Sequence, residues 1–93
     1  MTVARRYVIR GRVQGVGFRW FVQNAAMREG VAGWVTNRAD GGVEAYVEGE
    51  FDAVVRIERS LRMGPPGGRV DDVHAIEEAP VSGLTTFRIV DSI

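Results

Sequence analysis

The apolar residues of this chain repeat every second residue in some segments and about every 3.6 residues in others, and the order of these segments restricts the possible folds. Residues 7–13 alternate between an apolar face and a face that carries arginines, which is typical of a half-buried strand. The alternation returns over residues 43–48, where Val43, Ala45 and Val47 are expected to point inward and the side chains between them outward. Further strands are expected at residues 31–37, 70–77 and 85–90.

Two other segments have helical spacing. Residues 20–29, with Phe18 just before them, form the first, and Gly30 is a suitable residue to follow its end. Residues 52–63 form the second, which has an acidic residue in its first turn, a basic one in its last, and Gly64 after it. The apolar side of the second helix is expected to comprise Phe51, Val54, Val55, Ile57 and Leu61.

The order of the segments is strand, helix, two strands, helix, strand and a short extra strand, with a hairpin turn at residues 39–42. This order predicts an α+β fold, the ferredoxin-like split βαβ sandwich: an antiparallel sheet of four strands plus a short fifth, with two helices on one face. A chain of 93 residues is expected to form a single domain over residues 1–93. Since this fold hosts enzymes, RNA binders and regulatory modules alike, function must be argued from a site.

The overall charge and the cysteine content exclude several classes of function. The formal net charge is zero, which argues against a sequence-independent nucleic-acid binder and against a polybasic membrane contact. The chain has no cysteine, so disulfides, thiolate metal sites and a cysteine nucleophile are excluded. No apolar stretch follows the N-terminal arginines, so we expect no signal peptide, no membrane span and a cytoplasmic location.

The loop of residues 14–19 joins the end of a strand to the start of a helix. Helix N-termini present unpaired N–H groups and partial positive charge, and Gly15 and Gly17 allow consecutive N–H groups to point inward. Arg19 follows, and its guanidinium can donate two hydrogen bonds to phosphate oxygens. The alternative is a tight turn with one exposed arginine. Phe18 and Trp20 are expected to pack in the core or at the rim of the site.

Asn37 ends the second predicted strand. Asparagine is disfavoured in strands, so its presence there suggests either a turn-initiating residue or an amide that orients a water toward a ligand of the 14–19 loop. In a split βαβ sheet another strand separates the first strand from the second, so spacing alone does not show whether Asn37 faces Arg19.

Two segments of the sequence resemble signatures of the acylphosphatase family. Residues 11–19, GRVQGVGFR, resemble the first signature, and residues 33–37, GWVTN, followed by Gly41-Gly42-Val43 and Gly49, resemble the second. Residues 63–66 and 87–89 are similar to the family's end of the second helix and its last strand. The resemblance covers essentially the whole chain, and it implies the ferredoxin-like fold predicted above.

The resemblance implies hydrolysis of acyl phosphates to a carboxylate and phosphate, and it assigns roles by position. Arg19 corresponds to the phosphate-binding arginine and Asn37 to the residue that positions the attacking water. The backbone N–H groups that complete the phosphate site would be those of Gln14, Gly15, Val16, Gly17 and Phe18. Thr36 departs from the family, which usually has a longer, often basic side chain there. A free-standing enzyme of this kind is expected to need no cofactor and no metal, and to be a monomer.

Other residues offer weaker candidates. His74 lies in a late strand, and with Asp71 and Asp72 it is a possible metal cluster, but a charged strand surface explains the three residues better. Asp40 is explained by the hairpin turn.

Two alternative functions remain open on the sequence. One is a non-catalytic module that holds an anion or RNA through Arg6, Arg10 and Arg12, although no RNA-recognition signature with aromatic residues is present. The other is an acylphosphatase-like domain detached from a larger protein, since carbamoyl-transferring hydrogenase maturation factors carry such a domain at their N-terminus.

Overall fold

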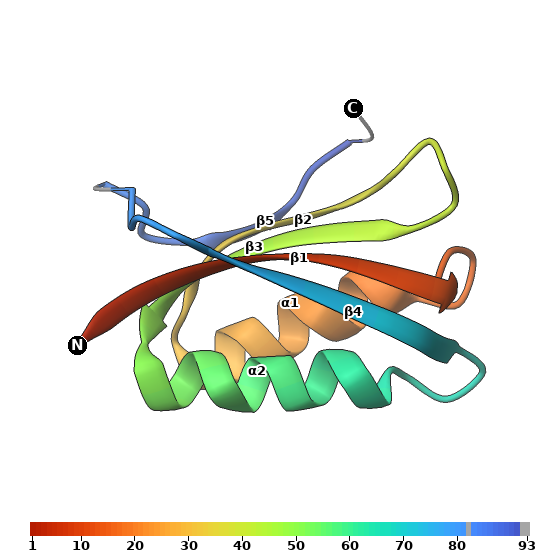
Figure 1. Cartoon of the computed structure of the whole chain (residues 1–93), viewed down its shortest axis with the longest axis horizontal. Coiled ribbons are helices and arrows are strands. Elements are labelled where there is room, and N and C mark those ends of the chain that lie inside the picture. Colours follow the sequence, from red (N-terminus) through yellow and green to blue (C-terminus); the bar gives the residue numbers. More distant parts are fainter. Residues whose placement is uncertain (82, 92–93) are drawn as a thin grey trace.

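The computed structural model describes residues 1–81 and 83–91, in which two helices pack on one face of a five-stranded sheet (Figure 1). The elements in chain order are β1 (Thr2–Arg12), α1 (Phe18–Glu29), β2 (Ala32–Asn37), β3 (Val43–Glu50), α2 (Phe51–Met63), β4 (Arg69–Glu78) and β5 (Phe87–Ile89). The α+β fold expected from the sequence is confirmed.

The strands lie in the order β4-β1-β3-β2-β5. The four long strands pair with one another in antiparallel fashion, and β3 lies between β1 and β2 as the split βαβ plan requires. The short β5 pairs in parallel with β2, from Gly33 against Phe87 to Val35 against Ile89. The complete sheet is therefore mixed, and both connections through a helix join strands that are not immediate neighbours.

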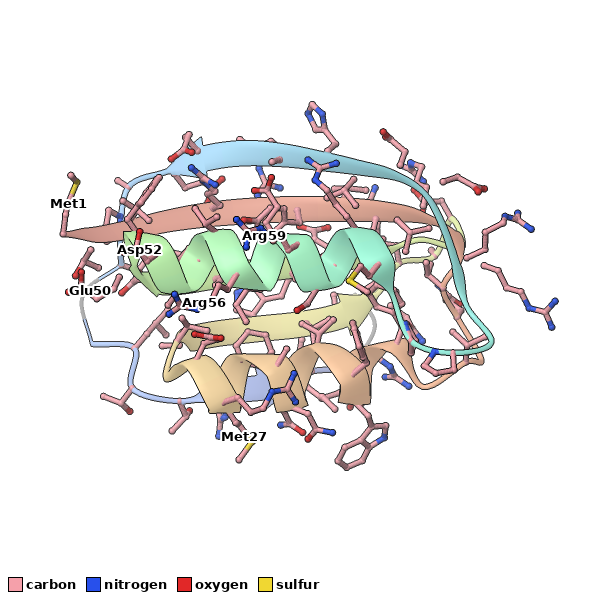
Figure 2. The ribbon with its side chains drawn as sticks, turned by 90° about the horizontal axis from the view of Figure 1, so that it is seen from below. Met1, Met27, Glu50, Asp52, Arg56 and Arg59 are labelled. Atoms are coloured by element: carbon pink, nitrogen blue, oxygen red, sulfur yellow. The ribbon has the colours of Figure 1, made fainter. Side chains whose placement is uncertain are left out.

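The core lies between the sheet and the helices. Figure 2, which looks onto the helix layer, shows α1 and α2 running beside each other across the sheet. Tyr7, Ile9 and Val43 are fully buried on the inner face of the sheet, and Val22 and Ile57 are fully buried on the helices. The inward faces predicted for β1 and β3 are thus confirmed. Neither helix of the described structure is long and apolar enough to cross a membrane.

The first strand begins at Thr2, five residues before its predicted start at Tyr7. The prediction was wrong because Arg5 and Arg6 do not look like strand residues in the sequence. In the structure Arg5 pairs with Glu58 of α2 and with Glu77 of β4. Arg6 pairs with Glu44 of β3 and with Glu78 of β4. These partners lie far away in sequence and compensate the arginine charges within the sheet.

Two expectations about exposure also need correction. Glu44 and Tyr46 point away from the helices as predicted, yet only 8% and 4% of their surface is exposed. Arg6 and Arg38 cover Glu44, and the Tyr46 ring stacks on Trp34 with their centroids 6.2 Å apart. Phe51, predicted on the apolar side of the second helix, is the first residue of α2 and is 45% exposed. Its ring contacts the guanidinium of Arg5.

Gly33 in β2 is a position where the sheet tolerates no side chain. Its φ is +144°, and a Cβ atom there would lie 1.8 Å from the carbonyl oxygen of Tyr46. We expect Gly33→Ala to lower the free energy of unfolding by more than about 2 kcal/mol, because backbone strain of about 1–3 kcal/mol adds to this clash. Urea unfolding of Gly33→Ala and Gly67→Ala measures the two effects separately, since Gly67 also has positive φ (+85°) but nothing within 4 Å. Equal losses in both variants would contradict the clash.

Candidate active site

The loop between β1 and α1 leads into a helix start whose backbone N–H groups have no side-chain cap. Gly15 and Gly17 both have φ of +76°, and Gly17 occupies the position that precedes the helix. No side chain caps this helix end, and no acidic residue lies in its first turn. The N–H groups of the first turn are therefore unpaired by side chains and carry the positive end of the helix dipole. A helix start of this kind favours an anion.

The helix starts two residues earlier than predicted, at Phe18 instead of Trp20, so Arg19 lies in its first turn. The Arg19 side chain is half-buried, and it makes no ion pair or hydrogen bond with the described residues. Phe18 is 2% exposed and packs in the core as expected. Trp20 is 65% exposed, so it does not pack in the core. Only the backbone of Phe18 is thus available to a ligand.

A cavity of about 220 Å³ opens at this helix start. It is lined by Val13, Gly15, Gly17, Phe18, Arg19, Trp20 and Asn37. The fold therefore brings Asn37 and Arg19, which are 18 positions apart in the sequence, to one cavity. Among the described residues that line it, none is a carboxylate or a histidine. Trp20 lies at the rim, one of the two places expected for it, whereas sequence reasoning missed Val13, which has no polar side chain that would draw attention.

Strand register explains how Asn37 reaches this cavity. Asn37 is the last residue of β2 and pairs with Val43 of β3, and Val43 pairs in turn with Ile9 of β1. The three residues form one row across the sheet, so Asn37 lies about 10 Å from β1 at the level where that strand approaches the loop. The Asn37 amide makes no hydrogen bond with other described protein groups. Thr36, by contrast, is fully buried, donates to the Asp91 carbonyl and does not line the cavity.

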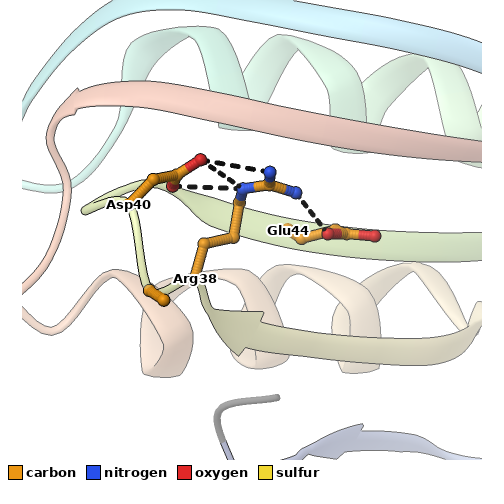
Figure 3. A pocket seen from close by; sticks show the side chains of 4 residues that line it. Arg38, Asp40 and Glu44 are labelled. Carbon is orange, nitrogen blue, oxygen red and sulfur yellow. Dashed lines mark hydrogen bonds and ion pairs between the residues drawn. The ribbon is translucent and has the colours of Figure 1, made fainter.

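The turn that follows Asn37 is fixed by the charged side chains of Arg38, Asp40 and Glu44, which bind one another (Figure 3). The Arg38 guanidinium lies 3.1 Å from Asp40 and 2.6 Å from Glu44, and the Gly42 N–H donates to Asp40 at 3.1 Å. The predicted turn role of Asp40 is thus borne out by geometry. Hydrogen bonds from Arg38 and then from the Gly42 N–H hold the pKa of Asp40 well below its usual range. The cavity of about 280 Å³ beside these residues is lined by charges that pair with one another.

The low pKa of Asp40 makes stability depend on pH. A carboxyl whose pKa is lower in the folded state stabilises the fold above its unfolded pKa of about 4, and this contribution is lost as the pH falls toward the folded value. We expect Asp40→Asn to lower the melting temperature at pH 7, with the difference from the native chain shrinking below pH 4. Thermal unfolding between pH 7 and pH 2 measures this. A constant difference at every pH would contradict the assignment. Asp72→Asn is the control, since Asp72 is exposed and forms no ion pair in the described structure.

The other candidate residues that the sequence offered lie outside this cavity, and some of them pair with carboxylates. His74 is exposed on β4, which β1 and β3 separate from β2, and it does not line the cavity. Within residues 1–81 and 83–91 no three acidic, histidine or cysteine side chains gather in a way that could hold a metal. Arg6 pairs with Glu44 and Glu78, and Arg10 lies 3.2 Å from Asp40. Two of the three arginines considered for RNA binding therefore pair with carboxylates, whereas Arg12 is exposed and has no ion pair among the described residues.

Comparison with known proteins decides which family this site belongs to. The family model described as acylphosphatase matches residues 5–89. The chain belongs to the acylphosphatase family. An acylphosphatase of Koribacter versatilis is 51% identical over 85 residues, covering 91% of this chain and 77% of that protein. The crystal structure of acylphosphatase from Bacillus subtilis superposes with a TM-score of 0.91 at 41% identity, covering 95% of this chain and 98% of that one.

These matches confirm the family predicted from the two signatures, and with it the enzyme class, a hydrolase of acid anhydrides.

The chain is also similar to part of a larger protein. It superposes on full-length HypF, in its phosphate- and nucleotide-bound form, with a TM-score of 0.89 at 35% identity. That match covers 99% of this chain but 12% of the other. The relatives of similar length are therefore the better guide to this chain.

Proposed function

We propose that the cavity at the start of α1 binds the phosphoryl group of an acyl phosphate, and that the chain hydrolyses the mixed anhydride to a carboxylate and phosphate. One observation supports this above all: an arginine that pairs with no carboxylate of the described residues, the uncapped start of a helix and an asparagine amide line a single cavity. The arginine and the helix start are hydrogen-bond donors, and the asparagine amide can both donate and accept. Such a site matches an anion with several oxygens and carries no negative charge of its own.

In the proposed complex the phosphoryl oxygens accept hydrogen bonds from two sources. The backbone N–H groups from Gln14 to Phe18 surround the group, and the Arg19 guanidinium donates two parallel bonds at its edge. Gly15 and Gly17 have no atoms within 4 Å of where a Cβ would be, so the loop is open on the side a ligand would approach. Binding of this type stabilises the charge that builds up on the phosphoryl oxygens during transfer.

Asn37 positions the attacking water in this proposal. Its carbonyl oxygen accepts a hydrogen bond from the water and holds the water oxygen in line with the bond to the leaving carboxylate. A carboxylate is a good leaving group, so little general-base help is needed. The cavity offers no protein base, and the water proton passes to a phosphoryl oxygen of the substrate. Catalysis then rests on position and charge.

The proposal also covers the oligomeric state of the chain and the range of its substrates. The loop, Arg19 and Asn37 of a single chain are sufficient for the proposed site, and the proposal is an active monomer made of the single domain 1–93. The cavity wall offers one large exposed apolar group, Trp20, outside the phosphoryl site. The site therefore selects for the acyl phosphate group more than for a particular acyl chain. A cytoplasmic location stays a prediction of the sequence.

Release of phosphate from benzoyl phosphate by the purified chain tests the function directly. We expect turnover that EDTA leaves unchanged, because the positive charge in the site comes from Arg19 and from backbone N–H groups. Loss of activity in EDTA would contradict this mechanism. A folded chain that binds phosphate without turnover would instead favour the anion-binding module.

The similarity to HypF gives the same experiment a second comparison. Carbamoyl phosphate and benzoyl phosphate share the phosphoryl end that Arg19 and the loop bind, so we expect no strong preference between them. A kcat/KM for carbamoyl phosphate at least 100-fold above that for benzoyl phosphate would favour the detached-domain alternative.

A further inference from the structure

The side chain of Gln14 connects the two halves of the proposed site. Gln14 is the first residue of the loop, and its Nε2 donates to the carbonyl oxygens of Arg38 and Gly42, at 2.8 Å each. Both acceptors belong to the turn between β2 and β3. Figure 1 shows this turn and the β1–α1 loop at the same end of the sheet. A side chain that belongs by sequence to the phosphate loop is therefore bound to the element that carries Asn37.

Both carbonyls also serve the turn itself. The Gly42 carbonyl accepts from the Arg38 N–H at 2.8 Å, and the Arg38 carbonyl accepts from the Gly41 N–H at 3.2 Å. A carbonyl oxygen has two lone pairs, so each accepts the Gln14 bond in addition. Arg38 directly follows Asn37, so the Gln14 amide is fixed one residue away from the amide proposed to hold the water.

Little else fixes the distance between loop and turn. β1 and β2 are not neighbours, and the ladders that connect them through β3 end at Ile9, Val43 and Asn37. Beyond this row the described structure provides one further direct link, the ion pair of Arg10 and Asp40. About half of each of those side chains is exposed, and exposed pairs hold geometry weakly. The half-buried Gln14 amide, with two short bonds to backbone, is the stronger constraint.

We propose that Gln14 is a positioning residue, whose side chain sets the distance between the phosphate loop and Asn37 and so aligns the water with the phosphoryl group. This inference rests on the proposed function. It separates the two parts of Gln14: the backbone N–H belongs to the phosphate site, and the side chain acts on the water through Asn37. A displacement of about 1 Å in such an alignment is enough to lower a rate about 100-fold.

A double-mutant cycle tests the coupling. Gln14→Met, Asn37→Ala and the double variant are compared with the native chain for kcat and KM with benzoyl phosphate, and for inhibition by inorganic phosphate. We expect Gln14→Met to lower kcat by about 10- to 100-fold. Inhibition by phosphate should change less than about twofold, because Arg19 and the loop backbone remain. In the Asn37→Ala background the same change should cause no further loss of kcat, since the residue through which it acts is gone.

The control is Gln23→Met, which removes the same type of bond elsewhere, from Gln23 Nε2 to the Phe87 carbonyl at 3.4 Å, and should leave kcat unchanged. If Gln14→Met does not fold, Gln14→Ala removes the N–H donors without adding a negative charge to the phosphate loop, and it enters the same cycle. An equal kcat loss in both backgrounds, or no loss in the native background, would overturn the inference and leave the proposed function intact. Absence of turnover by the native chain would instead remove the proposed function.

Discussion

Replacing Arg19 by alanine is expected to lower kcat/KM for benzoyl phosphate by about 10³-fold or more. In the proposed complex the guanidinium supplies two charge-assisted bonds and the positive charge beside the developing phosphoryl charge, and an arginine in this role contributes about 10³ to 10⁵ in rate. Arg19→Lys keeps the charge but loses the paired geometry, so it should recover only part of the loss. Steady-state kinetics with both variants measures the effect.

Stability should not follow activity in the Arg19 variants. Arg19 makes no ion pair or side-chain hydrogen bond within the described residues, so its removal breaks none of the polar contacts of the described structure. Melting temperatures within a few degrees of the native value are expected. Arg28→Ala is the matched control, because Arg28 is an exposed arginine in the last turn of the same helix. A loss of activity in Arg28→Ala as large as in Arg19→Ala would contradict a specific role for Arg19.

Replacing Asn37 by alanine is expected to lower kcat by about 10²- to 10³-fold with little change in KM, the size found when one positioned polar group is removed from a site. The amide acts on the water and the phosphoryl site binds the substrate, so the two kinetic constants should separate. Asn37→Asp should behave differently, because a carboxylate in the same cavity repels the phosphoryl group and weakens inhibition by inorganic phosphate.

The control for Asn37 is Asn24→Ala, which truncates an exposed asparagine of α1 outside the cavity. It should leave both constants near the native values. A rise of KM with unchanged kcat in Asn37→Ala would mean that the amide binds substrate and does not position water.

The fold was predictable because its elements obey local rules. The alternation in β1 and β3 and the helical spacing of α1 and α2 are set by which side chains face the core, and this information lies within each segment. The start of β1 was not predictable, because Arg5 and Arg6 become strand residues through partners 38 to 72 positions away. The exposure of Phe51 was not predictable for the same reason, since its neighbour Arg5 comes from another element.

The site was predictable in part. Gly15, Gly17 and Arg19 are contiguous in the sequence, so their conformational freedom and charge suggest an anion site without any tertiary information. The meeting of Asn37 with Arg19 depends on the order β1-β3-β2 and on the row of Asn37, Val43 and Ile9, which no local pattern contains. The link from Gln14 to the turn was invisible in the sequence, because glutamine has no spacing that marks its partner.

Hydrolysis of benzoyl phosphate by the native chain in ¹⁸O-labelled water tests the central claim most directly. In the proposed mechanism Arg19 and the loop hold the phosphoryl group while Asn37 directs water at phosphorus. Mass spectrometry of the products should therefore find one solvent oxygen in the phosphate and none in the benzoate. Label in the benzoate would mean that water attacks the acyl carbon, and it would contradict the assignment of this cavity to phosphoryl transfer.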